Sequence, residues 1–366
     1  MKELVERLFR AVLSGVGSHR KDLRLDPRQM KEVLEQGASW AIAHGFGSSA
    51  DLDTIEAGGR IGGALVEEVS ERAMERGRNQ LGTLGSGNHF VEIGYVEEIF
   101  DPVAARALRL EQDSVTVIIH TGSRGLGYQV CDDFISGMIR AASKYRIELP
   151  DRQLCCAPIS SEEGRSYLGA MSAAANFAFA NRQVITAFVR QTFEEVLGMS
   201  PRETGLSLVY DVCHNIAKME EHEVERKHRR LCVHRKGATR AFPPGHAQTP
   251  AAYRAVGQPV PIPGDMGRYS YVLVGTKRAY LETFGSTCHG AGRVLSRAAA
   301  RREGRNRPLV RELEERGIHV RSEGRMTLLE EMPEAYKDVS RVVDVCHRAG
   351  ISKKVARLVP TGVIKG

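Results

Sequence analysis

The stretch SVTVIIHTGSRGLG, residues 114–127, is a β-branched run that ends in a histidine and continues directly into a glycine-rich loop. Such a run is typical of a buried strand, and such a loop is typical of a segment that carries function on a rigid scaffold. Two further runs, LSLVYDVCH at 206–214 and YSYVLVGT at 269–276, have the same character. The sequence therefore predicts a sheet whose strands deliver polar side chains at their ends.

Helical segments surround these strands. Apolar residues recur at helical spacing in 1–14, 27–44, 169–198 and 291–303. Each glycine- or proline-rich stretch is short and is followed at once by a strand or helix, so no linker divides the chain. We therefore expect one mixed α/β (α+β) domain over 1–366. The dense charge run at 219–236 is either a solvated helix face or a functional segment, and the sequence favours neither.

The composition indicates a folded protein with a basic balance. The chain has 366 residues, with 52 Lys and Arg against 45 Asp and Glu, a formal charge of +7 and a pI of about 9.1. This balance mildly favours a polyanionic partner such as nucleic acid. No run reaches the roughly 18 apolar residues that span a bilayer, and the first residues are typical of an amphipathic helix, so we expect a cytoplasmic protein with no membrane partner. The seven cysteines form no Cys-x-x-Cys pair, which favours reduced thiols.

Three histidines occur where strands meet loops. His120 and His214 end two of the strand-like runs, and His89 follows the glycine-rich GTLGSG before another apolar run. If the strand ends share one edge of the sheet, the three imidazoles converge and provide ligands for Zn, Mn, Fe or Co. The alternative for each histidine taken alone is a half-buried side chain with an ordinary hydrogen bond.

A fourth histidine, His289, lies in GSTCHGAGRVLSRAAAR (285–301). The alanine-rich continuation predicts a helix directly after it, whose first amides would bind a phosphate. A histidine beside such amides can transfer protons or attack phosphorus. The alternative is a glycine-capped helix start without chemistry. Basic residues beside glycines or small residues suit phosphate binding as well. They are Arg124, Lys236, Arg240, Arg293 and Arg297.

Seven ordered motifs resemble the RtcB family of GTP-dependent RNA-splicing ligases. The motifs are GSGNHFVE, HTGSRGLG, DVCHNIAK, HRKGATRAFPPGH, PIPGDMG, STCHGAGR and the terminal VPTGVIKG. The resemblance implies a single large domain with central β-sheets flanked by helices. It also implies an enzyme that joins RNA 3′-phosphate or 2′,3′-cyclic phosphate ends to 5′-hydroxyl ends, with Mn²⁺ (two ions) and GTP, in tRNA splicing and RNA repair.

The resemblance implies roles for individual residues. His289 would be the nucleophile that forms a His-GMP adduct, and His89, His120 and His214 would hold the metal. Glu92 would bind the Watson–Crick edge of guanine, with Lys365 nearby. The implied nucleotide pocket comprises Asn88, His89, Phe90, Val91, Glu92, His214, Asn215, Pro263, Gly264, Asp265, Met266, Ser270, His289, Gly290, Ala291, Gly292 and Lys365. The implied contacts to RNA phosphates are Arg76, Arg124, Lys236 and Arg297.

One motif of the family has no counterpart in this sequence. Family members carry an Asp-x-x-Cys motif, upstream of the helices that begin this chain, which completes the two-metal site. The resemblance therefore implies a domain that is N-terminally incomplete and a weakened site if the chain acts alone. Cys213 and Cys288 adjoin motif histidines, but sequence neighbours point elsewhere, so neither is an expected substitute. Two alternatives stay open: a metal-dependent RNA phosphoesterase that does not need His289, and a non-catalytic RNA-binding fragment.

Overall fold

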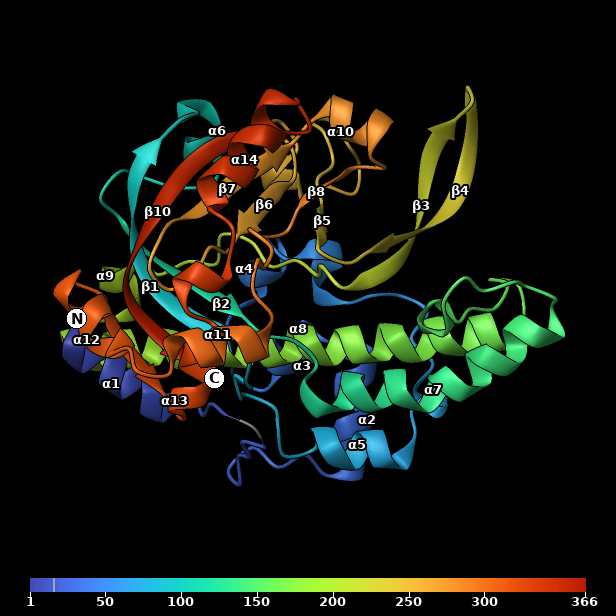
Figure 1. Ribbon diagram of the computed structural model, residues 1–366, viewed down its shortest axis with the longest axis horizontal. Coiled ribbons are helices and arrows are strands. Elements are labelled where there is room, and N and C mark those ends of the chain that lie inside the picture. Colours follow the sequence, from blue (N-terminus) through green and yellow to red (C-terminus); the bar gives the residue numbers. More distant parts are fainter. Residues whose placement is uncertain (16) are drawn as a thin grey trace.

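The computed structural model describes residues 1–15 and 17–366. Figure 1 shows a curled sheet on one side of a long central helix, α8, with smaller helices on the other side. The helices are α1 (Lys2–Ala11), α2 (Pro27–Gln36), α3 (Ala38–Ala43), α4 (Ser49–Leu52), α5 (Glu71–Gly77), α6 (Pro102–Ala107), α7 (Arg124–Lys144), α8 (Glu162–Leu197), α9 (Pro201–Thr204), α10 (Lys277–Glu282), α11 (Arg297–Gly304), α12 (Leu309–Glu315), α13 (Arg325–Glu330) and α14 (Val339–Arg348). Short 3-10 helices are η1 (Glu56–Gly59), η2 (Val66–Glu68), η3 (Arg152–Leu154), η4 (Ala251–Tyr253) and η5 (Pro333–Ala335).

The strands form one large sheet and two small ones. They are β1 (Phe90–Ile99), β2 (Val115–His120), β3 (Ile216–Val224), β4 (Lys227–Arg235), β5 (Ala238–Arg240), β6 (Pro259–Ile262), β7 (Ser270–Gly275), β8 (Ser286–Cys288), β9 (His319–Ser322) and β10 (Ser352–Lys365). The large sheet has the order β2-β1-β10-β7-β6, antiparallel throughout, and β9 pairs with β10 in parallel. Its register places Phe90 opposite both His120 and Lys365, so three residues of the implied site share one row across three strands.

Helix α8 is the packing axis of the molecule. Its 36 residues span about 54 Å at 1.5 Å per residue. Ser161 caps its first turn and Gly198, in the left-handed region, ends it. Small residues along α8 let neighbouring elements approach closely. One face of α8 packs against α2, α3 and α7 in one hydrophobic cluster. Another face of α8 packs against α1 and β1 in a second cluster. Helix α8 therefore connects the helical layer to the sheet.

Most of the expected elements are confirmed. The helices predicted in 1–14 and 169–198 are α1 and α8, and the strands predicted at 114–120 and 269–276 are β2 and β7. The helix predicted at 27–44 is broken into α2 and α3 at Gly37, whose φ is +60°. A Cβ at Gly37 would lie 2.2 Å from the carbonyl oxygen of Gly59, so only glycine fits this break. The mixed α/β class is confirmed.

Three local expectations are wrong. Residues 206–214 form no ladder beyond an isolated bridge at Asp211, because the side chain and backbone of this segment bond to Arg182 and Tyr253 instead. The charge run 219–236 is the β3–β4 hairpin and not a helix face; alternate residues such as Glu220 and His222 are buried. The helix expected from residue 291 begins only at Arg297, behind the cap Ser296.

The late start of α11 has a packing cause. Gly292 and Val294 exchange backbone hydrogen bonds with Lys337 and Ala335, so the chain after His289 runs as an extended loop against η5. The antiparallel bridge between Arg293 and Tyr336 holds this stretch in extended backbone, which a helical turn cannot have. Among the described residues, no helix is both long and apolar enough to cross a bilayer.

Candidate active site

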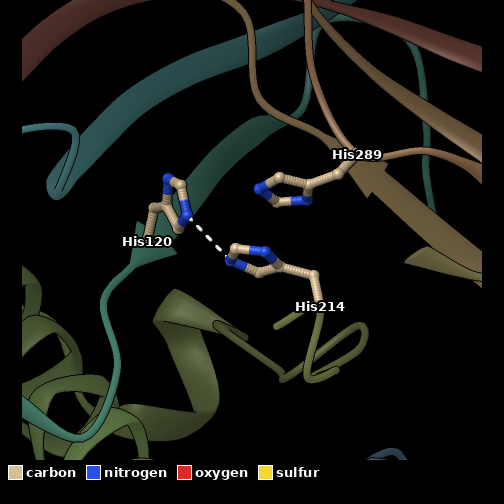
Figure 2. Close-up of side chains that lie close together, drawn as sticks. All are labelled: His120, His214 and His289. Carbon is tan, nitrogen blue, oxygen red and sulfur yellow. Dashed lines mark hydrogen bonds between the residues drawn. The ribbon is translucent and has the colours of Figure 1, made fainter. Parts of the chain in front are cut away.

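Three imidazoles converge at the end of the large sheet. His120 ends β2, His214 lies just before β3, and His289 directly follows β8. Their ligand atoms lie within 4.8 Å of one another. Nε2 of His120 is 3.2 Å from Nε2 of His214, and the rings of His214 and His289 stack with centroids 3.5 Å apart. Figure 2 shows the three rings pointing toward one another from separate segments.

The chemistry of this histidine cluster suits a metal ion. Burial lowers the pKa of His214 to about 2, and burial followed by the charge of Lys236 lowers the pKa of His289 to about 4. Burial also holds the pKa of His120 well below its usual value. The imidazoles are therefore neutral at pH 7, the form that ligates metals. Nδ1 of His120 and Nδ1 of His214 are buried without a hydrogen-bond partner. Neutral ring nitrogens of three histidines within 4.8 Å of one another fit a transition-metal ion.

His89 lies beside this cluster and not within it. Its ring centroid is 6.1 Å from that of His120, and burial lowers its pKa to about 3. Of the predicted metal set, His120 and His214 belong to the compact cluster, whose third member is His289. The expected nucleophile and two of the three expected metal ligands thus lie in one cluster.

Two cavities meet at the histidine cluster. The smaller has a volume of about 380 Å³ and the larger about 1250 Å³, and His120, His214, His289 and Asn88 line both. Of the implied nucleotide pocket, the smaller cavity is lined by Asn88, Phe90, Glu92, His214, Asn215, Pro263, Gly264, Asp265, Met266, His289, Gly290, Ala291, Gly292 and Lys365. His89 lines the larger cavity. Val91 points to the other face of β1, into the core, and Ser270 is buried behind Glu92.

The smaller cavity ends in a buried acid and a buried base. Glu92 accepts a hydrogen bond from Oγ of Ser270 at 2.8 Å, and burial raises the pKa of Glu92 to about 7. Burial lowers the pKa of Lys365 to about 8, and its Nζ is 5.1 Å from the centroid of the Phe90 ring. Burial also raises the pKa of Asp265 to about 6. The acceptor Glu92 and the donor Lys365, beside the Phe90 ring, suit a planar nucleobase whose edge carries both hydrogen-bond donors and an acceptor.

The loop after His289 reaches the cavity without a helix. Because α11 begins at Arg297, the amides of Gly290–Gly292 do not form a helix N-terminus, and the expected helix-dipole contribution to phosphate binding is wrong. Gly290, Ala291 and Gly292 still line the smaller cavity. Gly292 has φ +75°, which glycine adopts without strain.

The four basic residues implied to bind RNA phosphates differ in position. Lys236 lines both cavities, and Arg297, with a side chain 57% exposed, lines the smaller one. Arg124 lines the larger cavity, where burial lowers its pKa to about 10 and its Nε donates to Oγ1 of Thr83 at 3.1 Å. Arg76 is exposed on α5, away from the linings of both cavities in the described chain.

Sequence reasoning missed residues that hold the site from a distance. Arg182 of α8 donates from Nη1 to the carbonyl of Thr121 at 3.2 Å and from Nε to Oδ1 of Asp211 at 2.7 Å. It thus joins the segments that carry His120 and His214. Oγ1 of Thr239 lies 3.2 Å from Nδ1 of His289. Only contacts across the fold identify these residues, because each is an ordinary polar residue in its local sequence.

A buried carboxylate, Glu331, was also missed. Oε1 of Glu331 pairs with Nη1 of Arg293 at 3.1 Å and with Nε of Arg297 at 3.6 Å, and Oε2 lies 3.9 Å from Nζ of Lys365. The carboxylate therefore groups three cations at one wall of the smaller cavity. Cys213 and Cys288 are not part of the histidine cluster among the described residues, in line with their exclusion above.

Comparisons with known proteins agree with this geometry. A family model described as tRNA-splicing ligase RtcB matches residues 1–366. The chain is 57% identical to the tRNA-splicing ligase RtcB of Archaeoglobus fulgidus over 366 residues, which are all of this chain and 76% of that protein. It is 56% identical to the protein of the same name from Pyrococcus abyssi, where the match covers all of this chain and 40% of that protein. A third relative of that name, from Aeropyrum pernix, is 49% identical, and the match covers all of this chain and 76% of that protein.

Proposed function

Because the chain belongs to the RtcB family of tRNA-splicing ligases, we propose that it seals RNA 3′-phosphate or 2′,3′-cyclic phosphate ends to 5′-hydroxyl ends through a covalent His289-GMP intermediate. One observation supports this most strongly. His289 lies in the compact histidine cluster and lines both a small cavity with base-recognition groups and a larger cavity. A nucleotide in the first cavity and an RNA end in the second would therefore meet at the same imidazole.

The metal part of the proposal rests on the neutral ring nitrogens. His120 and His214 would hold a divalent ion such as Mn²⁺, with His89 as a neighbouring ligand. When bound, the ion would neutralise phosphate charge next to the reacting atoms.

The nucleotide part rests on Glu92 and Lys365. Guanine offers N–H donors at N1 and N2, which the Glu92 carboxylate can accept, and a carbonyl at C6, which Lys365 can donate to. Adenine presents the reverse pattern on its Watson–Crick edge, so ATP would leave these buried groups unpaired. We therefore propose GTP as the nucleotide, with its phosphates toward His289.

His289 is prepared for attack on phosphorus. With the proton on Nδ1 donated to Oγ1 of Thr239, the lone pair of Nε2 is free, and the depressed pKa keeps the ring unprotonated. Nε2 forms a bond to the α-phosphorus while the bond to the β-bridging oxygen breaks and pyrophosphate leaves. An oxygen of the RNA 3′-phosphate then displaces His289 from phosphorus. Finally the 5′-hydroxyl attacks the activated 3′-phosphorus, loses its proton, and GMP leaves.

The decisive experiment uses GTP labelled at the α-phosphate with Mn²⁺. We expect an acid-labile label on the wild-type chain and none on His289→Ala. His228→Ala is a matched control, since His228 is exposed on the β3–β4 hairpin, and it should keep the label. If the chain takes label only after a polypeptide comprising the extra residues of a longer relative is added, its site is completed in trans. No label under either condition would contradict the proposal.

The same variants test the phosphoesterase alternative. Opening of a cyclic phosphate does not need the nucleophile, so a chain that hydrolyses 2′,3′-cyclic ends equally with and without His289, and takes no label, is a phosphoesterase. RNA binding with no Mn²⁺-dependent step would instead identify a binding fragment.

A further inference from the structure

We propose that Tyr128 is a stacking platform for an unpaired RNA base next to the joining ends, an inference that rests on the proposed function. Tyr128 lies on α7 and keeps 66% of its surface exposed. A single exposed aromatic side chain means little by itself. Three further features of its surroundings give this one a function.

The first feature is its position relative to the reaction centre. Arg124 is the first residue of α7, with φ +55°, and Tyr128 follows it by four residues, about 6 Å further along the helix axis. Arg124 and His89 lie side by side, since the position of a Cβ added to Gly85 would be 2.4 Å from Cζ of Arg124 and 2.6 Å from Nδ1 of His89. The first turn of α7 therefore separates Tyr128 from the arginine that lies beside His89.

The second feature is the rim of the larger cavity. Gly127 and Cys131, which flank Tyr128 on α7, line the same cavity as His120 and His289. Tyr128 itself is not part of that lining, and its side chain is exposed beside these two residues on α7. A strand that leaves the cavity past Gly127 and Cys131 would pass this exposed residue.

The third feature is a second guanidinium. Cζ of Arg76, on the neighbouring helix α5, lies 5.6 Å from the centroid of the Tyr128 ring. A cation over one face fixes the ring by a cation–π contact, while the high exposure of the ring leaves surface for a base. Arg76 beside the ring then supplies a positive charge for an adjoining phosphate. Cationic side chains around an aromatic platform are the pattern by which proteins bind single-stranded nucleic acid.

The chemistry selects the ligand. Stacking needs an unpaired base, because the faces of paired bases inside a duplex are covered by their neighbours. It does not discriminate among bases, since each has a π face. The site would thus favour frayed or single-stranded RNA beside the break and would add affinity without a sequence requirement.

The test measures binding of a single-stranded RNA with a 3′-phosphate, by fluorescence anisotropy, at several salt concentrations. We expect Tyr128→Ala to weaken binding about tenfold, which lies in the lower part of the range for base stacking on aromatic side chains, with an unchanged salt slope. Tyr128→Phe should bind like wild type. Arg76→Ala should reduce the magnitude of the logarithmic salt slope by about 0.7, as expected for one lost phosphate contact on a single strand. The control Ile135→Ala removes an exposed apolar side chain, 43% exposed, two turns further along α7, and should change nothing.

An abasic scan identifies the stacked base directly. One abasic position should weaken wild-type binding about tenfold and leave Tyr128→Ala binding unchanged, since the two losses are the same contact. If no position shows this coupling, or if Tyr128→Ala binds RNA like wild type, the inference is wrong. Melting temperatures of the variants show whether each is folded. The GTP-label assay on the wild-type chain reports separately on the proposed function, so a chain that takes no label but shows the coupling refutes only the ligase proposal.

Discussion

Replacing Arg182 by methionine should uncouple the two segments that carry His120 and His214. The guanidinium binds Asp211 at 2.7 Å and the carbonyl of Thr121 at 3.2 Å, and its Nη2 lies 3.8 Å from Sγ of Cys213. Thr121 follows His120 in sequence, and Cys213 precedes His214. One side chain from α8 therefore sets the spacing of the two imidazoles.

The size of the effect follows from burial. The side chains of Arg182 and Asp211 are each 10% exposed, so Arg182→Met leaves a carboxylate in the interior without its cation. Breaking one partner of a buried pair costs about 3–5 kcal/mol of unfolding free energy. Loss of an outer partner that orients metal ligands typically weakens metal binding by roughly 10- to 100-fold. Both effects are expected in Arg182→Met.

A second variant separates stability from positioning. In Arg182→Met with Asp211→Asn the buried charge is gone, so most of the stability should return, whereas the link to Thr121 stays broken and Mn²⁺ binding should stay weak. The matched control is Arg190→Met, because Arg190 is on the same helix and binds Asp51 in a similar buried pair at 2.7 and 2.8 Å. Its Nε donates to the carbonyl of Leu206 at 3.0 Å, eight residues before His214, whereas Arg182 bonds at Thr121 and Asp211, one and three residues from the two histidines. Arg190→Met should lose comparable stability and keep its Mn²⁺ affinity.

The assays are urea unfolding for stability and the Mn²⁺ EPR signal for binding. If Arg182→Met binds Mn²⁺ like wild type, or if the double variant regains affinity together with stability, Arg182 supports the fold only and the positioning argument is refuted.

Three more outcomes are expected. Thr239→Ala should slow the first-order labelling of His289 by GTP at least tenfold, whereas Thr239→Ser keeps the hydroxyl and the rate. Equal rates in wild type and both variants would contradict the argument that Thr239 keeps the His289 proton on Nδ1. GTP affinity should rise as the pH increases through about 7, because only ionised Glu92 accepts both guanine donors, and titration calorimetry of Glu92→Gln should show weak binding without this step. Burial opposes ionisation of Glu56, but its ion pairs with Lys218 and Arg240 lower its pKa from 4.5 to about 2. The free energy of unfolding that ionised Glu56 contributes is therefore fully present above pH 4.5 and lost as the pH falls toward 2. In urea unfolding at several pH values, Glu56→Gln should flatten that part of the stability curve and lower the free energy of unfolding by about 3 kcal/mol at pH 7.

Local patterns in the sequence were sufficient for much of the site. The β-branched run before His120 forms β2, and most residues that the family motifs implied line the smaller cavity. These predictions succeed because strand propensity, turn glycines and motif residues are properties of a few consecutive positions. The family membership follows from the same motifs.

Other predictions failed where distant segments compete for the same backbone groups. The loop after His289 bonds to residues 335–337 and delays the helix until Arg297, although its local sequence favours helix earlier. The 206–214 run is held by Arg182 and Tyr253 and forms no ladder. Tertiary contacts outweighed propensity at both places, since intrinsic preferences are worth well under about 1 kcal/mol per residue.

The sequence by itself determined the family, the mixed α/β class and the residue types available for chemistry. Only the tertiary structure decided that His289 joins His120 and His214 in one cluster with His89 alongside, and that Phe90, His120 and Lys365 share a row of the sheet. It also showed that Arg182 and Glu331 organise the site from remote elements. The physical reason is that pairing register and burial depend on segments far apart in the chain, which no local pattern encodes.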